Sequence, residues 1–249
     1  MITQEVLNKI AQTAGDAILK IYNSCTDMEI VEKSDGSPVT KADYQADAII
    51  QNLLRAKSSY PILSEENPVP YEIRKTWTRF WIVDPLDGTK DFIAKNGQFT
   101  VNIALIEDNY PIMGVVYVPV SATTYYAQKG FGAYKNDIHI YNRSTRKELI
   151  ATDSIFHSTE ETLTFLKDNN IANIIRFGSS IKLCKLAEGE IDVYPRFNGT
   201  KEWDTAAGHI IANEAGCKLI DIKTKVELLY NKKDIKNNYF IASRNNLEF

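Results

Sequence analysis

Residues 81–89 read WIVDPLDGT, in which an apolar segment runs directly into two aspartates. Such an apolar run is typical of a strand buried in a core, and the carboxylates of Asp84 and Asp87 follow it. Carboxylates are hard oxygen donors of the kind that Mg²⁺ prefers. Pro85 restricts the backbone of the turn, and Gly88 lets the backbone approach a ligand closely. A solvated Asp-Pro turn is the alternative, and the apolar strand and the Gly-Thr pair that flank the turn argue against it.

Acidic residues also stand at the ends of other apolar elements. Glu65 and Glu66 follow the apolar segment 61–64, while Asp43 and Asp204 lie near the starts of two predicted helices. Taken singly, each has an ordinary explanation, which is a solvated loop for the glutamates and helix capping for the aspartates. Together, acids from both halves of the chain indicate one metal site between two domains.

Hydrophobic periodicity predicts two helices and then a run of strands in the first half. The helices cover 3–24 and 41–57, and Thr40 is the expected N-cap of the second, with Asp43 three residues later. Strands are expected at 61–64, 80–83, 99–106, 112–118 and 123–128. In the second half, strands at 150–152, 174–176, 191–194 and 218–221 alternate with helices at 160–168, 179–189 and 203–216. This alternation indicates an α/β unit, and the boundary between the halves falls near 130–145.

Composition excludes several classes of protein. With 249 residues, of which 44% are hydrophobic, the chain can bury a core, and no apolar run approaches the ~18 residues of a transmembrane helix. The net charge of −3 disfavours a nucleic-acid polymer as a partner. The N-terminus lacks the basic and apolar regions of a signal peptide. The widely spaced Cys25, Cys184 and Cys217 are expected to be free thiols, which favours a cytoplasmic protein.

Three motifs occur in a distinctive order, namely SEE at residues 64–66, DPLDGT at 84–89 and WDTAAG at 203–208. On these motifs the chain resembles the lithium-sensitive, Mg²⁺-dependent phosphatases of the inositol monophosphatase superfamily. Within it, the chain is similar to the bacterial 3'(2'),5'-bisphosphate nucleotidases, with Asp91 standing where that group more often has Glu. The segments that carry this narrower resemblance are 35–43, 90–93, 97–105, 178–182, 187–189, 194–197 and 202–209.

The resemblance implies an α/β fold of the α+β sugar-phosphatase type, which is a layered αβαβα sandwich with two subdomains at residues 1–135 and 136–249. It implies two or three Mg²⁺ ions and attack of a metal-activated water on the phosphate. Thr89, oriented by Asp43, would take part in activating that water, and Glu66 would support it. The metal ligands that it implies are Glu65, Asp84, Asp87 and Asp204, together with the backbone carbonyl of Leu86.

Substrate contacts are expected from both halves of the chain. The Gly88 and Thr89 amides would hold the phosphate, and segment 178–180 precedes a predicted helix, so that it could meet ribose or phosphate oxygens. Lys182 and Arg196 are candidates for a second phosphate, and the fork geometry of Arg196 makes it the better one. A solvated helix face is the alternative for Lys182. The full expected set is Gly88, Thr89, Gly178, Ser179, Ser180, Lys182, Arg196, Glu202 and Asp204.

The remaining aromatic and histidine side chains have open interpretations. Tyr194 or Phe197 could pack against an adenine ring, and both could equally belong to the core. His139, His157 and His209 lack the partner pattern of a metal ligand or a nucleophile, so each is expected to be a surface or core histidine.

The resemblance implies hydrolysis of the 3'-phosphate of adenosine 3',5'-bisphosphate to AMP, which clears a by-product of sulfate assimilation and sulfonation. One alternative is an inositol-phosphate or broad sugar-phosphate phosphatase, and another is a non-catalytic Mg²⁺-dependent nucleotide-binding protein. Haloacid-dehalogenase phosphatases carry D-x-D-G-T, whereas here Pro85 and Leu86 separate the acids, so that family is set aside.

The expected partner is a small phosphorylated nucleotide and not a nucleic-acid polymer. The expected assembly is a monomer or a homodimer. The expected location is the cytoplasm, and peripheral association with the inner membrane is an alternative that no basic amphipathic helix in the sequence supports.

Overall fold

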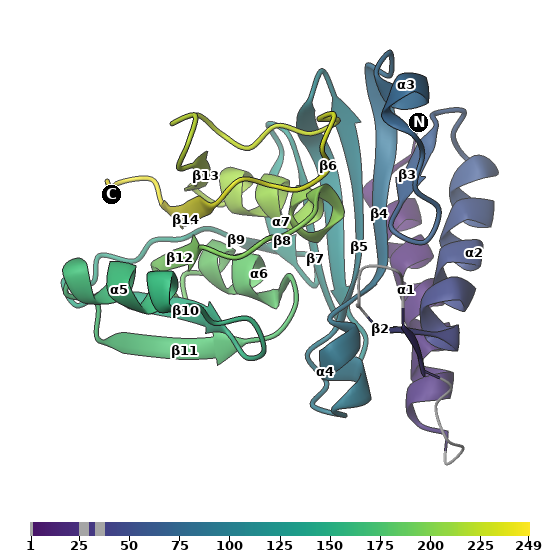
Figure 1. Cartoon of the computed structure of the whole chain (residues 1–249). Helices are drawn as coiled ribbons and strands as arrows, with labels where there is room; N and C mark the ends of the chain where they lie inside the picture. The colour runs from purple at the N-terminus through teal and green to yellow at the C-terminus, as the bar shows by residue number, and fades with distance from the viewer. Residues whose placement is uncertain (1, 25–29, 33–37) are drawn as a thin grey trace.

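The computed structural model describes residues 2–24, 30–32 and 38–249, and its elements stack as helices, sheet, helices, sheet and helix (Figure 1). Helices α1 (Gln4–Tyr22) and α2 (Lys41–Arg55) cover one face of the first sheet. Helices α6 (Ile181–Ala187) and α7 (Glu202–Glu214) lie between the two sheets. Helix α5 (Glu160–Asp168) covers the outer side of the second sheet. The predicted αβαβα sandwich is therefore confirmed.

The first sheet has seven strands, and only its first pair, β3 and β4, is parallel. Strand β4, the second strand from one edge, is apolar on both faces, because Trp81 and Val83 pack under α1 and α2 while Phe80 and Ile82 pack toward α7. The strands, in spatial order, are β3 (Ile62–Ser64), β4 (Arg79–Asp87), β5 (Thr100–Glu107), β6 (Tyr110–Val118), β7 (Thr123–Gln128), β8 (Gly132–Lys135) and β9 (Ile138–Ile140).

The second sheet has five strands in the order β11-β10-β12-β14-β13. Strand β10 pairs in parallel with β11 and β12, and β14 runs antiparallel between β12 and β13. Helix α7 is buried on nearly all sides between the sheets, so its sequence is apolar around its circumference. The strands are β10 (Ile150–Ser154), β11 (Asn173–Phe177), β12 (Val193–Arg196), β13 (Cys217–Asp221) and β14 (Phe240–Arg244).

Strand β4 differs from the prediction in a way that shapes the site. It continues past Val83 to Asp87, and its register against β5 pairs Asp84 with Asn102 and Asp87 with Thr100. Between these two pairs, β4 advances by three residues while β5 advances by two, so β4 contains a β-bulge. In a regular strand, residues three positions apart, as Asp84 and Asp87 are, would point to opposite faces of the sheet. The bulge therefore aims both carboxylates to the same side.

Several short elements escaped prediction because they are too short to show a period. They are α3 (Tyr71–Arg74), α4 (Thr89–Ile93), β1 (Ile30–Glu32), β2 (Pro38–Thr40), β8, β9 and β14. The first sheet extends to Ile140 and the second begins at Ile150, while the subdomain division at 135/136 stays a prediction. Cys184 and Cys217 are buried free thiols. Cys25 and residues 35–37 lie outside the described residues. Within the described residues, no helix has the length and apolarity needed to cross a membrane.

The loop 228–237 ties the start of α7 to the first half of the chain. Glu202 is fully buried and accepts hydrogen bonds from the backbone N–H groups of Asn231 (2.7 Å) and Lys232 (2.8 Å) and from the Lys232 Nζ (2.8 Å). On the other side of the loop, Arg74 donates to the Asn231 side chain (2.8 Å). The first turn of α7, which carries Asp204, is therefore held in place by buried polar contacts.

Replacing Glu202 by Ala is expected to lower the free energy of unfolding by about 2–4 kcal/mol, because two buried N–H groups lose their acceptor. Chemical denaturation measures the change. The matched control is Glu72→Ala, since Glu72 pairs with Lys75 on the surface and its side chain is 74% exposed; there the change should stay within about 0.5 kcal/mol. Equal effects of the two substitutions would contradict the assignment.

Candidate active site

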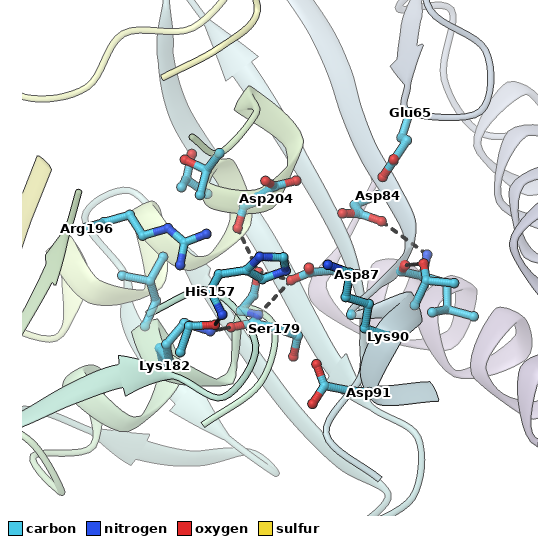
Figure 2. A pocket seen from close by; sticks show the side chains of 18 of the residues that line it. Glu65, Asp84, Asp87, Lys90, Asp91, His157, Ser179, Lys182, Arg196 and Asp204 are labelled. Carbon is cyan, nitrogen blue, oxygen red and sulfur yellow. Dashed lines mark hydrogen bonds between the residues drawn. The ribbon is translucent and has the colours of Figure 1, made fainter. Parts of the chain in front are cut away.

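A cavity of about 350 Å³ opens where the first sheet, α4 and α7 meet the second half of the chain. Figure 2 shows Glu65 and Asp84 on one side, Arg196 and Lys182 on the other, and Asp87 and Asp204 between them. Both halves therefore contribute walls to one site. The predicted residues that line it are Glu65, Asp84, Leu86, Asp87, Gly88, Thr89, Ser179, Ser180, Lys182, Arg196 and Asp204.

Three carboxylates meet at the acidic end of the cavity. Oxygens of Glu65 after β3, Asp84 on β4 and Asp204 on α7 all lie within 4.8 Å of one another. Asp87 lines the same cavity outside this trio. An all-oxygen donor set of carboxylates matches what Mg²⁺ and similar hard cations bind, so the residues present fit a divalent cation.

Burial makes Asp84 and Asp204 difficult to ionise. Desolvation raises the pKa of Asp84 well above its usual range, and the charges of Glu65, Asp87, Asp204 and Asp43 raise it further. Burial, followed by the charges of Asp87 and Glu65, likewise raises the pKa of Asp204. A cation between the carboxylates would reverse this effect by stabilising their charged forms.

Asp43 takes part in capping helix α2 and also contacts Thr89, so it has both of the roles considered from the sequence. Its Oδ2 accepts from the backbone N–H (2.8 Å) and the hydroxyl (2.7 Å) of Thr40, which completes the capping box at the start of α2. Its Oδ1 accepts from the Thr89 hydroxyl at 3.2 Å. The structure thus joins Asp43 and Thr89, and Gly88 (φ +90°) allows the left-handed turn that starts α4 at Thr89.

A buried polar chain behind Glu65 was missed in the sequence. The Ser64 hydroxyl donates to Asp47 Oδ1 at 2.5 Å and accepts from the Glu66 N–H at 3.4 Å. Gln51 donates to the other oxygen of Asp47 at 2.6 Å. This chain fixes the Glu65–Glu66 turn against α2. The sequence did contain a signal for this contact, because Asp47 lies four positions after Asp43 and therefore on the same face of the helix.

Two of the three amides of the 178–180 turn are already used within the protein. The Gly178 N–H donates to the Gln98 side chain at 2.8 Å, and the Ser180 N–H donates to Asp87 at 2.6 Å. Both donors are therefore used within the protein. Of the three residues, Ser179 and Ser180 line the cavity, and the Ser179 hydroxyl has no partner among the described residues.

The end of the cavity opposite the acids is basic. Lys182 is 5% exposed, so the alternative that it lies on a solvated helix face is wrong. Burial, together with the charge of nearby Arg196, lowers the pKa of Lys182 to about 8. Its Nζ donates to the backbone oxygens of Phe177 (3.2 Å) and Ser179 (2.6 Å). Arg196 is 8% exposed, its Nε has no hydrogen-bond partner among the described residues, and none of them forms an ion pair with its side chain. A buried cation without a carboxylate indicates a site for an anion.

His157 also lines the cavity, which the sequence did not reveal. His157 is exposed to solvent, and desolvation at the cavity together with the charges of Lys90, Arg196 and Lys182 lowers its pKa to about 4. His209, by contrast, is the expected core histidine, since it is fully buried and lies 2.9 Å from the Tyr230 hydroxyl.

Some expected contacts lie away from the cavity wall. Glu202 is committed to the 228–237 loop, and neither it nor Glu66 nor Gly178 is among the lining residues. Tyr194 lines the cavity and is therefore available to a ligand. Phe197 instead packs against Phe165 and Tyr239 in an aromatic cluster.

Comparisons with known proteins relate the chain to one family. The model of the inositol monophosphatase family matches residues 3–248. The chain is 45% identical over 226 residues to the 3'(2'),5'-bisphosphate nucleotidase CysQ of Salmonella typhimurium, covering 89% of this chain and 91% of that protein. The crystal structure of CysQ from Bacteroides thetaiotaomicron superposes with a TM-score of 0.88 at 41% identity, covering 98% and 97% of the two chains. The suhB protein of Bartonella henselae gives a TM-score of 0.81 at 28% identity, covering 96% and 93%.

Asp84→Asn is expected to stabilise the metal-free protein. Folding raises the pKa of Asp84 above 3.8, so the stability that protonation provides is present below about pH 4 and is lost as the pH rises toward the folded value. Metal-free wild type should therefore melt at a lower temperature at pH 8 than at pH 5. The neutral amide should raise the melting temperature at pH 8 by a few degrees, since ~1 kcal/mol corresponds to about 2–4 °C in a chain of this size.

Magnesium provides the complementary measurement. It should raise the melting temperature of the wild type at pH 8 and have little effect on Asp84→Asn, because binding stabilises only a protein that retains the site. A wild type that melts at the same temperature at both pH values, together with a less stable Asp84→Asn protein, would contradict the account.

Proposed function

Because the chain belongs to the inositol monophosphatase family, we propose that it is a bisphosphate nucleotidase that removes the 3'-phosphate of adenosine 3',5'-bisphosphate, giving AMP and phosphate. The relatives called CysQ, which bear the name of this activity, match most of the chain. The protein is thus a phosphatase in its chemistry. What distinguishes a nucleotide substrate from other phosphate esters is the basic end of the cavity.

The observation that carries the proposal is the pair of buried cations facing the acids. Arg196 is without an ion-pair partner in the described part of the chain, and Lys182 is bonded to backbone oxygens alone there. A substrate with a second phosphate satisfies both, whereas inositol 1-phosphate has only the phosphate that is to be cleaved. We therefore place the scissile 3'-phosphate at the acidic end and the 5'-phosphate at the basic end.

Glu65, Asp84, Asp87, Asp204 and the Leu86 carbonyl are proposed to hold two or three Mg²⁺ ions. When bound, Mg²⁺ lowers the pKa of water and offsets the charge of the phosphoryl group in the transition state. The Gly88 and Thr89 amides are proposed to donate hydrogen bonds to the phosphate oxygens, which places the phosphorus beside the acids.

Thr89 and Asp43 are proposed to handle the proton of the attacking water. The Thr89 hydroxyl donates to Asp43 Oδ1 at 3.2 Å, so its lone pairs point away from Asp43 and can accept a hydrogen bond from water. Asp43 Oδ2 is already occupied by Thr40, which holds the carboxylate in one orientation. Glu66 is proposed to support this arrangement from the adjacent turn.

The wider assignments follow from the same proposal. We propose that the protein acts in the cytoplasm, that lithium inhibits it, and that it clears a by-product of sulfate assimilation. A monomer and a homodimer are both compatible with a site built from one chain. The second candidate activity, hydrolysis of inositol or sugar phosphates, is favoured only by the family as a whole.

A phosphate-release assay with adenosine 3',5'-bisphosphate and inositol 1-phosphate tests the activity. We expect Mg²⁺-dependent turnover with a large preference in kcat/KM for the nucleotide, and AMP as the product. Asp87→Asn should abolish turnover while the protein remains folded, as judged by circular dichroism. A preference for inositol 1-phosphate, or near-normal activity of Asp87→Asn at saturating Mg²⁺, would refute the assignment.

Arg196→Met should raise KM for the bisphosphate by about 10- to 100-fold, because a charge-assisted hydrogen bond contributes ~1.5–3 kcal/mol. For adenosine 3'-monophosphate, which lacks the second phosphate, KM should change little. Arg176→Met is the matched control, since the Arg176 side chain is 52% exposed and outside the cavity. Equal loss on both substrates would show that Arg196 does not bind the second phosphate.

A further inference from the structure

Ser180 lies between two carboxylate-bearing elements from different halves of the chain. It is 4% exposed, and its backbone N–H (2.6 Å) and hydroxyl (2.7 Å) both approach Oδ2 of Asp87. The same hydroxyl lies 2.7 Å from the backbone oxygen of Asp204 on α7. The hydroxyl has one proton, so it donates to one of these two acceptors at a time, while the N–H always serves Asp87.

Asn102 on β5 completes this group of contacts. Its Nδ2 donates to the Ser180 hydroxyl at 2.8 Å and to Asp87 Oδ2 at 3.3 Å. The Thr100 hydroxyl donates a hydrogen bond to the Asn102 side-chain oxygen at 2.9 Å, which orients the amide so that its nitrogen faces Asp87. The Ser180 N–H, the Ser180 hydroxyl and the Asn102 Nδ2 thus converge on Oδ2 of Asp87, and within the described part of the chain its Oδ1 receives no hydrogen bond.

We propose that Ser180 is a positioning residue for the metal site: it fixes Asp87 through Oδ2, leaves Oδ1 for a divalent cation, and holds the Asp204-bearing helix against that carboxylate. The inference rests on the proposed metal-dependent function. Partners that orient a ligating carboxylate in this way usually contribute 10- to 100-fold to metal affinity.

The alternative role, a direct substrate contact, fits Ser180 poorly. Its N–H and hydroxyl are engaged inside the protein, and its side chain is almost fully buried. The neighbouring Ser179 lines the same cavity, and its hydroxyl has no partner in the described residues. Both serines line the cavity, but the hydroxyl of Ser180 is engaged within the protein, whereas that of Ser179 has no described partner.

The location of Ser180 explains why one hydroxyl can affect the whole cation site. Asp87 comes from the β4 bulge in the first sheet, and Asp204 comes from α7. Ser180 is the N-cap residue of α6, which packs beside α7. It therefore joins elements on which the distance between the ligands depends.

The experiment compares Ser180→Ala with Ser179→Ala in the full-length protein. Calorimetric titration with MgCl₂ in the absence of substrate measures metal affinity, and steady-state kinetics at saturating Mg²⁺ measure kcat and KM for adenosine 3',5'-bisphosphate. We expect Ser180→Ala to weaken Mg²⁺ binding about 10- to 100-fold and to lower kcat, with KM within about threefold of wild type. Ser179→Ala should leave Mg²⁺ affinity unchanged.

Asn102→Ala is the second variant, and it decides the question if Ser180→Ala does not fold. It should also weaken Mg²⁺ binding, because it removes donors to Asp87 and to Ser180. Unchanged Mg²⁺ affinity in the folded variants, or a rise in KM alone, would overturn the positioning role. A wild type that binds Mg²⁺ without hydrolysing the bisphosphate would refute the proposed function while the titration still tests Ser180.

Discussion

Repulsion among carboxylates that the fold brings together is the constraint on which the site depends. Glu65, Asp84 and Asp204 place oxygens within 4.8 Å of one another in a partly buried cavity, and burial, followed by the neighbouring carboxylate charges, raises the pKa of Asp84. Like charges at this separation are unfavourable unless a proton or a cation lies between them. The surrounding structure holds them there all the same, through the β4 bulge, the Ser64–Asp47 contact and the tie between Glu202 and the 228–237 loop.

Charge also divides the cavity into two ends with different tasks. The acids at one end need a cation, and Arg196 and Lys182 at the other need an anion. A small molecule with two phosphates suits both ends, since one phosphate meets a bound cation and the other meets the buried side chains. A net charge of −3 therefore disfavours a polymer of phosphates without disfavouring a nucleotide carrying two of them.

The sequence predicted the parts of the site whose chemistry is local. Apolar strands that end in acids identified Glu65, Asp84 and Asp87, and the capping pattern identified Asp43, whose two oxygens serve both the helix and Thr89. Contacts between distant segments could not be read in the same way. Ser180 reaches Asp87 across 93 positions, Glu202 turns away from the cavity toward a loop about 30 positions later, and His157 enters the cavity from a loop without a periodic pattern.

A crystal structure of Thr89→Ala with adenosine 3',5'-bisphosphate tests the central claim most directly, because this variant should bind the substrate without consuming it. The two-ended cavity predicts density for the 3'-phosphate beside Asp84 and Asp204 and for the 5'-phosphate within hydrogen-bond distance of Arg196 and Lys182. A nucleotide bound in the reverse orientation, or one whose second phosphate projects into solvent away from Arg196, would contradict the account.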